Sequence, residues 1–154
     1  MVEDSLRLKR FTIRELRESD LPSVVKIERL SFSTPWSETL FFNEIHMQRS
    51  IPKVAVIDER IAGYICANHV ADEGHILNLA VHPDFRGKGI AKILVKNILE
   101  ELKANACRFL YLEVRASNNA ARKLYEDFGF SVVWTRKLYY TEPKEDAVIM
   151  MLRL

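Results

Sequence analysis

The sequence predicts one α/β (α+β) domain over residues 1–154, with a mixed, mostly antiparallel central sheet of about seven strands flanked by about four helices. Three observations support this fold class. The chain has 154 residues, 48% of them hydrophobic, which suits one globular domain with a sizeable core. Short apolar runs alternate with segments of helical periodicity. Some neighbouring runs are separated only by short turns, which favours hairpins and antiparallel pairing.

The N-terminal half places two helical segments between its strands. Phe11 and Ile13 alternate with polar residues, as in a half-buried strand. Ser19 or Asp20 can cap a helix that has Pro22 in its first turn. In order, we expect a strand at 10–16, a helix ending near 31, a short helix around 40–45, and strands at 54–57 and 61–69 joined by a hairpin at 58–60.

The C-terminal half continues the alternation of strand and helix. Ile90, Leu94 and Ile98 recur at helical spacing, and Gly129 is placed to end a later helix. In order, we expect a turn at 71–74, a strand at 77–81, a turn at 82–88, a helix from 90 to beyond 102, a strand at 108–114, a helix at 118–128, and strands at 131–139 and 147–154.

The chain is organised around residues 77–96, where a strand, a glycine turn and a helix start follow one another. Such a junction directs free backbone N–H groups at one point and can bind an anion. Gly87 and Gly89 have no Cβ, so a bulky ligand can approach the backbone there. Lysines at 88, 92 and 96 stack on one helix face and repel one another. Either a bound polyphosphate offsets this cost, or the lysines form an ordinary solvated face.

Two common phosphate-binding motifs do not fit this loop. The dinucleotide fingerprint needs glycine or alanine where Lys92 stands, and the Gly-Lys-Ser/Thr of a P-loop is missing. The remaining pattern, Arg86-x-x-Gly89-x-Ala91, resembles the loop with which the GCN5-related N-acetyltransferases hold the pyrophosphate of acetyl-coenzyme A (acetyl-CoA). The resemblance implies acetyl-CoA as cosubstrate, direct acetyl transfer to an amine, and no metal.

The second half of the chain resembles one branch of that superfamily. The matching segments are Leu112–Asn118, Leu124–Glu126, Phe128–Phe130, Tyr139–Tyr140 and Glu145–Ala147. Phe32–Ser37 resembles the Phe-Pro-Trp-Ser loop of this branch, with extra residues before its proline. The resemblance extends from about Phe11 to Leu152. It implies an enzyme that acetylates the N-terminal alanine of a small-subunit ribosomal protein and has no direct contact with nucleic acid or membrane.

Glu113 and Tyr125 are the candidate catalytic residues. Glu113 shares a strand face with Phe109 and Tyr111, where a carboxylate is either a salt-bridged structural residue or a base with a raised pKa. Tyr125 could be an ordinary core aromatic. By resemblance, Glu113 takes the proton of the acceptor ammonium and Tyr125 protonates the coenzyme A thiolate. Asn118 can cap the following helix and, by resemblance, also binds the pantetheine arm of the cofactor.

The resemblance also assigns residues to the two substrates. The cofactor-binding residues would be Leu79, Ala80, Val81, Arg86, Gly87, Lys88, Gly89, Ile90, Ala91, Lys92 and Asn118. The backbone at 79–81 would pair with pantetheine, and the Val81 N–H would polarise the acetyl carbonyl. The acceptor groove would be lined by Phe32, Pro35, Trp36, Tyr139 and Tyr140, which could instead belong to the core. His82 is expected to be a loop residue, and the other histidines, at 46, 69 and 75, lack metal-ligand spacing.

The chemistry of the acceptor favours an N-terminal amine over a lysine. An α-amine with a pKa of about 7.7–8.0 is neutral about a tenth of the time at pH 7, whereas a lysine with a pKa of about 10.4 is neutral only about 0.04% of the time. A single glutamate base therefore suffices more easily for the α-amine. A broad N-terminal or small-amine acetyltransferase and a non-catalytic acetyl-CoA-binding module are the alternative interpretations.

Composition argues against several other classes. The formal net charge of +2 at pH 7 does not call for a nucleic-acid partner. Met1–Lys9 contain no apolar signal-peptide core, and no apolar run approaches the roughly 20 residues that span a bilayer. Cys66 and Cys107 are isolated, which favours buried thiols over a disulfide or zinc site. We therefore expect a cytoplasmic enzyme or binding domain. We also expect it to be a monomer or weak dimer.

Overall fold

A computed structural model describes residues 10–154, so the expectation about a signal peptide in Met1–Lys9 lies outside the described residues. The strands are β1 (Phe11–Glu15), β2 (Ser50–Ile57), β3 (Arg60–Val70), β4 (Glu73–Val81), β5 (Phe109–Arg115), β6 (Ser131–Thr141) and β7 (Lys144–Arg153). The helices are α2 (Leu21–Ser31), α3 (Glu38–His46), α4 (Ile90–Ala104) and α5 (Asn119–Asp127), with short 3-10 turns η1 (Glu18–Asp20) and η2 (Pro83–Phe85). The predicted order of strands and α-helices is confirmed.

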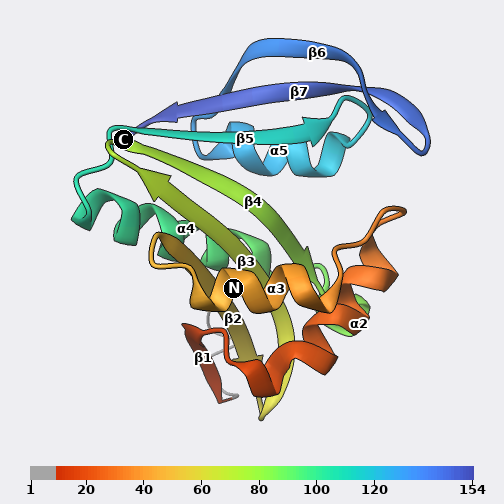
Figure 1. Cartoon of the computed structure of the whole chain (residues 1–154), viewed down its shortest axis with the longest axis vertical. Coiled ribbons are helices and arrows are strands. Elements are labelled where there is room, and N and C mark those ends of the chain that lie inside the picture. The colour runs from red at the N-terminus through yellow and green to blue at the C-terminus, as the bar shows by residue number, and fades with distance from the viewer. Residues whose placement is uncertain (1–9) are drawn as a thin grey trace.

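These strands form one seven-stranded sheet in the order β1-β2-β3-β4-β5-β7-β6. Neighbouring strands are antiparallel except β4 and β5, which are parallel. The predicted mixed, mostly antiparallel sheet is therefore confirmed. The chain between β4 and β5 contains α4, because a parallel return needs a long crossover connection. Figure 1 shows that β4 and β5 start side by side and then separate.

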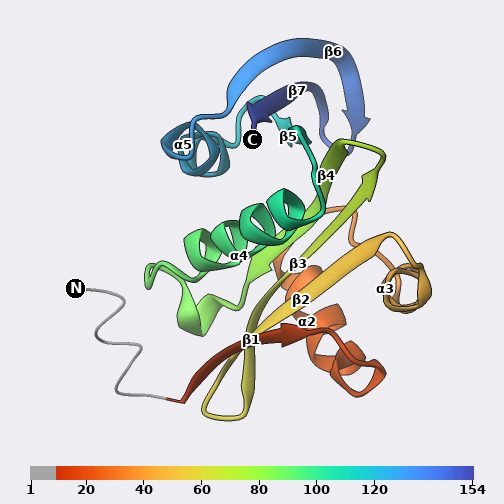
Figure 2. The same ribbon diagram turned by 90° about the vertical axis from the view of Figure 1, so that its left-hand side faces the viewer.

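Helices lie on both faces of the sheet (Figure 2). On one face, α4 and α5 pack on a core in which Ile90, Leu94 and Leu110 are fully buried. On the other face, α2 and α3 pack on a second core that contains Phe41. The cover is thinnest at the edge strand β6, where Trp134 is 66% exposed. None of the helices in residues 10–154 is long and apolar enough to cross a membrane.

Three strands begin earlier than the sequence predicts, namely β2, β7 and β4, and β4 starts at Glu73, inside the turn expected at 71–74. β2 starts at Ser50 and passes through Pro52, whose carbonyl accepts the Leu16 N–H at 3.0 Å. The nitrogen of Pro52 faces the same side but has no N–H to donate back to Leu16, so the pairing of β2 with β1 ends at this residue. β7 starts at Lys144 because the polar residues that follow it pair with β6 in a hairpin. Apolar patterning alone does not reveal these polar strand ends.

The side chain of Asp20 does not cap α2 as expected. Its carboxylate accepts hydrogen bonds from the Arg14 guanidinium, at 2.7 and 2.9 Å, and from the Arg17 N–H at 2.8 Å. Burial alone would raise the pKa of Asp20, but these hydrogen bonds outweigh that effect and hold the pKa below its ordinary value. The largely buried ion pair therefore fastens β1 to the start of α2.

Replacing Asp20 by asparagine is expected to destabilise the fold in a pH-dependent way. At pH 7 the free energy of unfolding should fall by about 2 kcal/mol, because the Arg14 pair is broken. Since the folded-state pKa is depressed, this stabilisation is present above the unfolded-state pKa and is lost as the pH falls through the folded-state value. Urea unfolding should therefore separate the two proteins at pH 7, and the difference should shrink as the pH falls below the unfolded-state pKa and through the lower folded-state pKa.

Glu18→Gln is the matched control for this measurement. Glu18 contacts His46 at 2.7 Å, but both side chains are more than half exposed. Exposed pairs contribute at most about 1 kcal/mol, so the control should change stability little at either pH. Equal losses in the two variants at pH 7 would contradict the role given to Asp20.

Candidate active site

The site begins where β4 and β5 separate. Their pairing ends at Ile76 opposite Leu112, and the register between β3 and β4 shifts beside Leu77. From Leu77 to Val81, the edge of β4 that faces β5 has no strand partner within the described part of the chain. Backbone polar groups seldom remain unpaired. This open edge can therefore pair with an extended ligand.

The predicted glycine turn follows β4 directly. Gly87 and Gly89 have φ angles of +76° and +80°, a left-handed conformation that glycine adopts at no steric cost. Gly89 is the N-cap of α4, and its carbonyl accepts the Ile93 N–H at 3.2 Å. The helical amides at 90–92 therefore precede the first intrahelical bond and are free to bind an anion.

A cavity of about 470 Å³ runs along this turn. Nine of the eleven predicted cofactor residues line it: Leu79, Ala80, Val81, Arg86, Gly87, Gly89, Ile90, Ala91 and Lys92. Lys88 is not among its lining residues, and its Nζ lies 5.7 Å from the centre of the Phe85 ring. Asn118 also lies outside this cavity and caps α5, where its side chain accepts the Ala121 N–H at 3.1 Å.

Arg86 is engaged within the protein. Its guanidinium donates to the Val81 carbonyl at 3.0 Å and to the Ser31 Oγ at 3.2 Å. These bonds tie the glycine turn to the end of β4 and to α2. Arg86 therefore shapes the turn in addition to bringing a positive charge to it.

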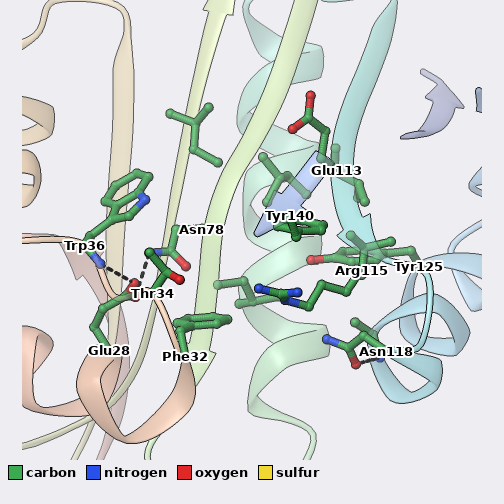
Figure 3. A pocket seen from close by; sticks show the side chains of 16 residues that line it. Glu28, Phe32, Thr34, Trp36, Asn78, Glu113, Arg115, Asn118, Tyr125 and Tyr140 are labelled. Carbon is green, nitrogen blue, oxygen red and sulfur yellow. Dashed lines mark hydrogen bonds between the residues drawn. The ribbon is translucent and has the colours of Figure 1, made fainter. Parts of the chain in front are cut away.

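A second cavity, of about 250 Å³, adjoins the first and contains both predicted catalytic residues (Figure 3). Leu79 and Ala121 line both cavities, so the two are direct neighbours. One wall comes from α2 and the segment after it, with Glu28, Phe32, Thr34 and Trp36. The opposite wall carries Glu113, Arg115, Asn118, Tyr125 and Tyr140.

Three of the five predicted acceptor residues line this second cavity, namely Phe32, Trp36 and Tyr140. Pro35 and Tyr139 are not lining residues. Tyr139 is 44% exposed, and its ring lies 4.3 Å from the Arg136 guanidinium. A register shift between Arg136 and Tyr140 breaks the simple alternation of faces along β6, so sequence periodicity could not place Tyr139.

Glu113 lies on the exposed face of β5. Its Oε1 is 3.3 Å from the Arg136 guanidinium, and its side chain is 37% exposed. The sequence left a salt-bridged residue and a catalytic base as alternatives. The structure contains the ion pair, and the base role stays a prediction. The contact uses one carboxylate oxygen, so the other can accept a proton from a substrate in the cavity.

Tyr125 is buried on α5, with its ring edge-on to Phe130 at a centroid distance of 5.5 Å. Burial raises the pKa of its hydroxyl, so this group stays protonated at neutral pH. It can therefore donate a hydrogen bond in the cavity that it lines. An ordinary thiol has a pKa of about 8.5. Because burial raises the pKa of the Tyr125 hydroxyl further above that value, full proton transfer to a thiolate is less favourable than it would be from an unperturbed phenol.

Glu145 fixes the hairpin that carries Tyr140. Its carboxylate accepts the Ser117 N–H at 2.5 Å and lies 3.5 Å from the Arg115 guanidinium. Arg115 in turn lies 4.2 Å from the centre of the Tyr140 ring. The matching Glu-Asp-Ala segment in the sequence was the available signal, but it did not indicate this bracing role.

Glu28 is a cavity residue that the sequence analysis missed. It is only 1% exposed and lines the second cavity. Its carboxylate accepts hydrogen bonds from the Tyr64 hydroxyl, the Asn78 side-chain amide at 2.7 Å and the Trp36 N–H at 2.9 Å. The available signal was a charged residue one helical turn after Val24, on the apolar face of α2.

Three other residues agree with their predicted structural roles. His82 is a loop residue whose Nδ1 accepts the Asp84 N–H at 3.0 Å. Cys66 and Cys107 are buried free thiols, and burial raises the pKa of both. These residues are not among those that line the two adjoining cavities.

Comparison with known proteins identifies the family. A family model described as the acetyltransferase (GNAT) family matches residues 21–130, which is more than half of the chain. The chain belongs to this family. A curated relative, the ribosomal protein bS18-alanine N-acetyltransferase of Salmonella typhimurium, is 38% identical over 143 residues, covering 92% of this chain and 96% of that protein. The Escherichia coli K12 protein of the same name is 36% identical with the same coverage.

Solved structures of acetyltransferases share the same architecture. The crystal structure of the ribosomal-protein-S18-alanine N-acetyltransferase from Escherichia coli matches with a TM-score of 0.87 and 36% identity, covering 93% of both chains. NAA60 from Arabidopsis thaliana, in complex with a bisubstrate analogue, matches with a TM-score of 0.86 at 24% identity, covering 93% of this chain and 97% of that one. The predicted GNAT fold is confirmed.

Proposed function

We propose that this protein transfers the acetyl group of acetyl-CoA to the N-terminal α-amine of another protein, and that the acceptor is the N-terminal alanine of a small-subunit ribosomal protein. The observation that carries the proposal is the pair of adjoining cavities, one along the glycine turn and one containing Glu113 and Tyr125. The relatives named for alanine acetylation support the choice of acceptor. Because ribosomal proteins are synthesised in the cytoplasm, the proposal includes cytoplasmic action.

The first cavity fits acetyl-CoA by its donors. The unpaired edge of β4 offers backbone groups to the amides of an extended pantetheine. The free amides at the start of α4, together with Lys92, suit a pyrophosphate. In this arrangement the Val81 N–H is the donor proposed for the acetyl carbonyl oxygen. The thioester supplies the activated acetyl group.

The second cavity would hold the acceptor amine. Glu113 takes one proton from the ammonium, and the neutral amine then attacks the thioester carbonyl carbon. The carbonyl oxygen gains negative charge, which the Val81 N–H stabilises. When the carbon–sulfur bond breaks, the Tyr125 hydroxyl donates a hydrogen bond to the departing thiolate. The nitrogen of the adduct gives up its second proton, and this proton neutralises the thiolate. The products are therefore the acetylated amine and coenzyme A, and the first proton stays on Glu113 until solvent removes it.

Acetyl transfer to short synthetic peptides, followed by mass spectrometry that locates the acetyl group, tests the proposal. The panel contains a peptide with a free N-terminal alanine, the same peptide with its α-amine blocked and a free lysine, and spermidine. We expect modification of the free alanine only. Transfer to lysine or spermidine alone would overturn the proposed acceptor. Absence of transfer, with acetyl-CoA still bound, would favour a non-catalytic module.

A further inference from the structure

Glu28 is a buried carboxylate that no cation neutralises in the described part of the chain. Its three hydrogen-bond donors are a phenol, a side-chain amide and a backbone N–H. Transfer of a carboxylate from water to an interior is costly unless several donors replace the lost water. Burial of such a carboxylate is therefore not expected to stabilise the fold by itself. Its position and its three hydrogen bonds need another explanation.

The three donors belong to three different parts of the fold. The Glu28 Oε1 accepts from Tyr64 on β3 and Asn78 on β4, whereas its Oε2 accepts from the Trp36 N–H. One carboxylate therefore links α2, the sheet and the segment 32–36 between α2 and α3. Figure 3 shows the bonds from Trp36 and Asn78 to Glu28, on the side of the cavity opposite Glu113.

The segment 32–36 has few other polar anchors. At its start, the Phe32 N–H donates to the Glu28 carbonyl at 3.0 Å, and the Ser33 hydroxyl donates to the Glu142 carbonyl at 2.7 Å. Its residues from Phe32 to Pro35 are exposed. At the other end, the Trp36 N–H is held by the buried carboxylate. Glu28 thus fixes both ends of the segment, through its backbone and its side chain.

We propose that Glu28 is a positioning residue for the acceptor, an inference that rests on the proposed function of the second cavity. It holds Phe32 and Trp36 at a fixed distance from β4, so that the acceptor finds a preformed wall. A preorganised wall lowers the ordering cost of binding. Glu28 lines the wall opposite Glu113, and both of its carboxylate oxygens already accept hydrogen bonds within the protein, so it acts through Trp36 and not on the chemical step.

Glu28→Gln tests this role with little change in volume. Glutamine has one carbonyl oxygen and an NH₂ group that donates only. If the oxygen serves Tyr64 and Asn78, the NH₂ faces the Trp36 N–H and that contact is lost. We expect the KM for an alanine peptide to rise about tenfold or more, with kcat within about threefold of the original and an unchanged dissociation constant for acetyl-CoA.

Tyr64→Phe is the matched control. It removes another donor to the same carboxylate, but Tyr64 does not line the cavity. This variant should have a lower melting temperature and a peptide KM within about twofold of the original. If Glu28 were purely structural, Glu28→Gln would likewise lower the melting temperature and leave the peptide KM unchanged. An unchanged KM in Glu28→Gln would therefore overturn the proposal. Parallel loss of acetyl-CoA affinity would overturn it as well.

A second measurement is independent of enzymatic activity. The chain has two tryptophans, and Trp134 is 66% exposed, so Trp134→Phe leaves Trp36 as the only fluorophore of this type. In that background, Glu28→Gln should raise the acrylamide quenching constant about twofold, because the segment is released. Unchanged quenching would overturn the positioning role, whatever the acceptor proves to be. Absence of acetyl transfer to the alanine peptide by the unsubstituted protein would instead overturn the proposed function.

Asn78→Ala supplies the same test if Glu28→Gln does not fold. It keeps the link between Glu28 and Trp36 but removes the one between Glu28 and β4. Asn78 also lines the second cavity, so the quenching of Trp36 is the deciding quantity, and it should rise as in Glu28→Gln but by a smaller factor. Unchanged quenching would contradict the proposal.

Discussion

Replacing Gly89 by glutamate is expected to weaken acetyl-CoA binding by at least about 100-fold. Two effects act together. A side chain at φ +80° costs about 1–2 kcal/mol, and it distorts the turn that presents the free amides. The new carboxylate also lies at the start of α4, where it competes for the donors proposed for the pyrophosphate. Isothermal titration calorimetry with acetyl-CoA measures the loss directly.

Two further variants separate these effects. Gly89→Ala carries the backbone strain without the charge and should lose about tenfold in affinity. Gly129→Ala also places a side chain at a positive φ, of +100°, but at the end of α5, outside both cavities. It should lower the melting temperature and leave the affinity unchanged. Full affinity in Gly89→Glu would contradict the placement of the pyrophosphate.

The features that the sequence predicted well are those that local signals encode. The helical spacing of Ile90, Leu94 and Ile98 matches the buried face of α4. Gly87 and Gly89 both have the positive φ that the turn requires. In such segments, propensity, periodicity and tertiary contacts agree, so a local pattern suffices.

The features that the sequence did not predict depend on distant partners. Glu28 meets Tyr64 and Asn78, which are 36 and 50 residues away, and no local pattern indicates such pairs. The partner of Asp20 is Arg14 on β1, and this ion pair prevails over the helix cap that Asp20 could form. In both cases, tertiary contacts decided how a polar group is satisfied.

Replacing Glu113 by glutamine is expected to lower kcat/KM for an alanine peptide by about 100-fold at pH 6.5 and by much less at pH 9. Below the α-amine pKa of about 7.7–8.0 the acceptor is an ammonium ion and needs a base, whereas above it the amine is already neutral. Glutamine can still accept the Arg136 hydrogen bond through its oxygen, so the geometry is retained. Initial rates between pH 6 and 9.5 provide the measurement.

Tyr125→Phe should produce a different pH profile. Phenylalanine keeps the ring packed on Phe130 and removes only the hydroxyl. Because burial keeps this hydroxyl protonated, the expected loss of kcat/KM, about 10- to 100-fold, should be the same at every pH in the range.

Glu100→Gln, which removes an exposed carboxylate on α4, is the control for both variants and should leave the rates unchanged. A flat profile for Glu113→Gln would contradict the base role, and a sloping one for Tyr125→Phe would contradict the thiolate role. The two slopes therefore distinguish proton removal from the acceptor and stabilisation of the leaving group.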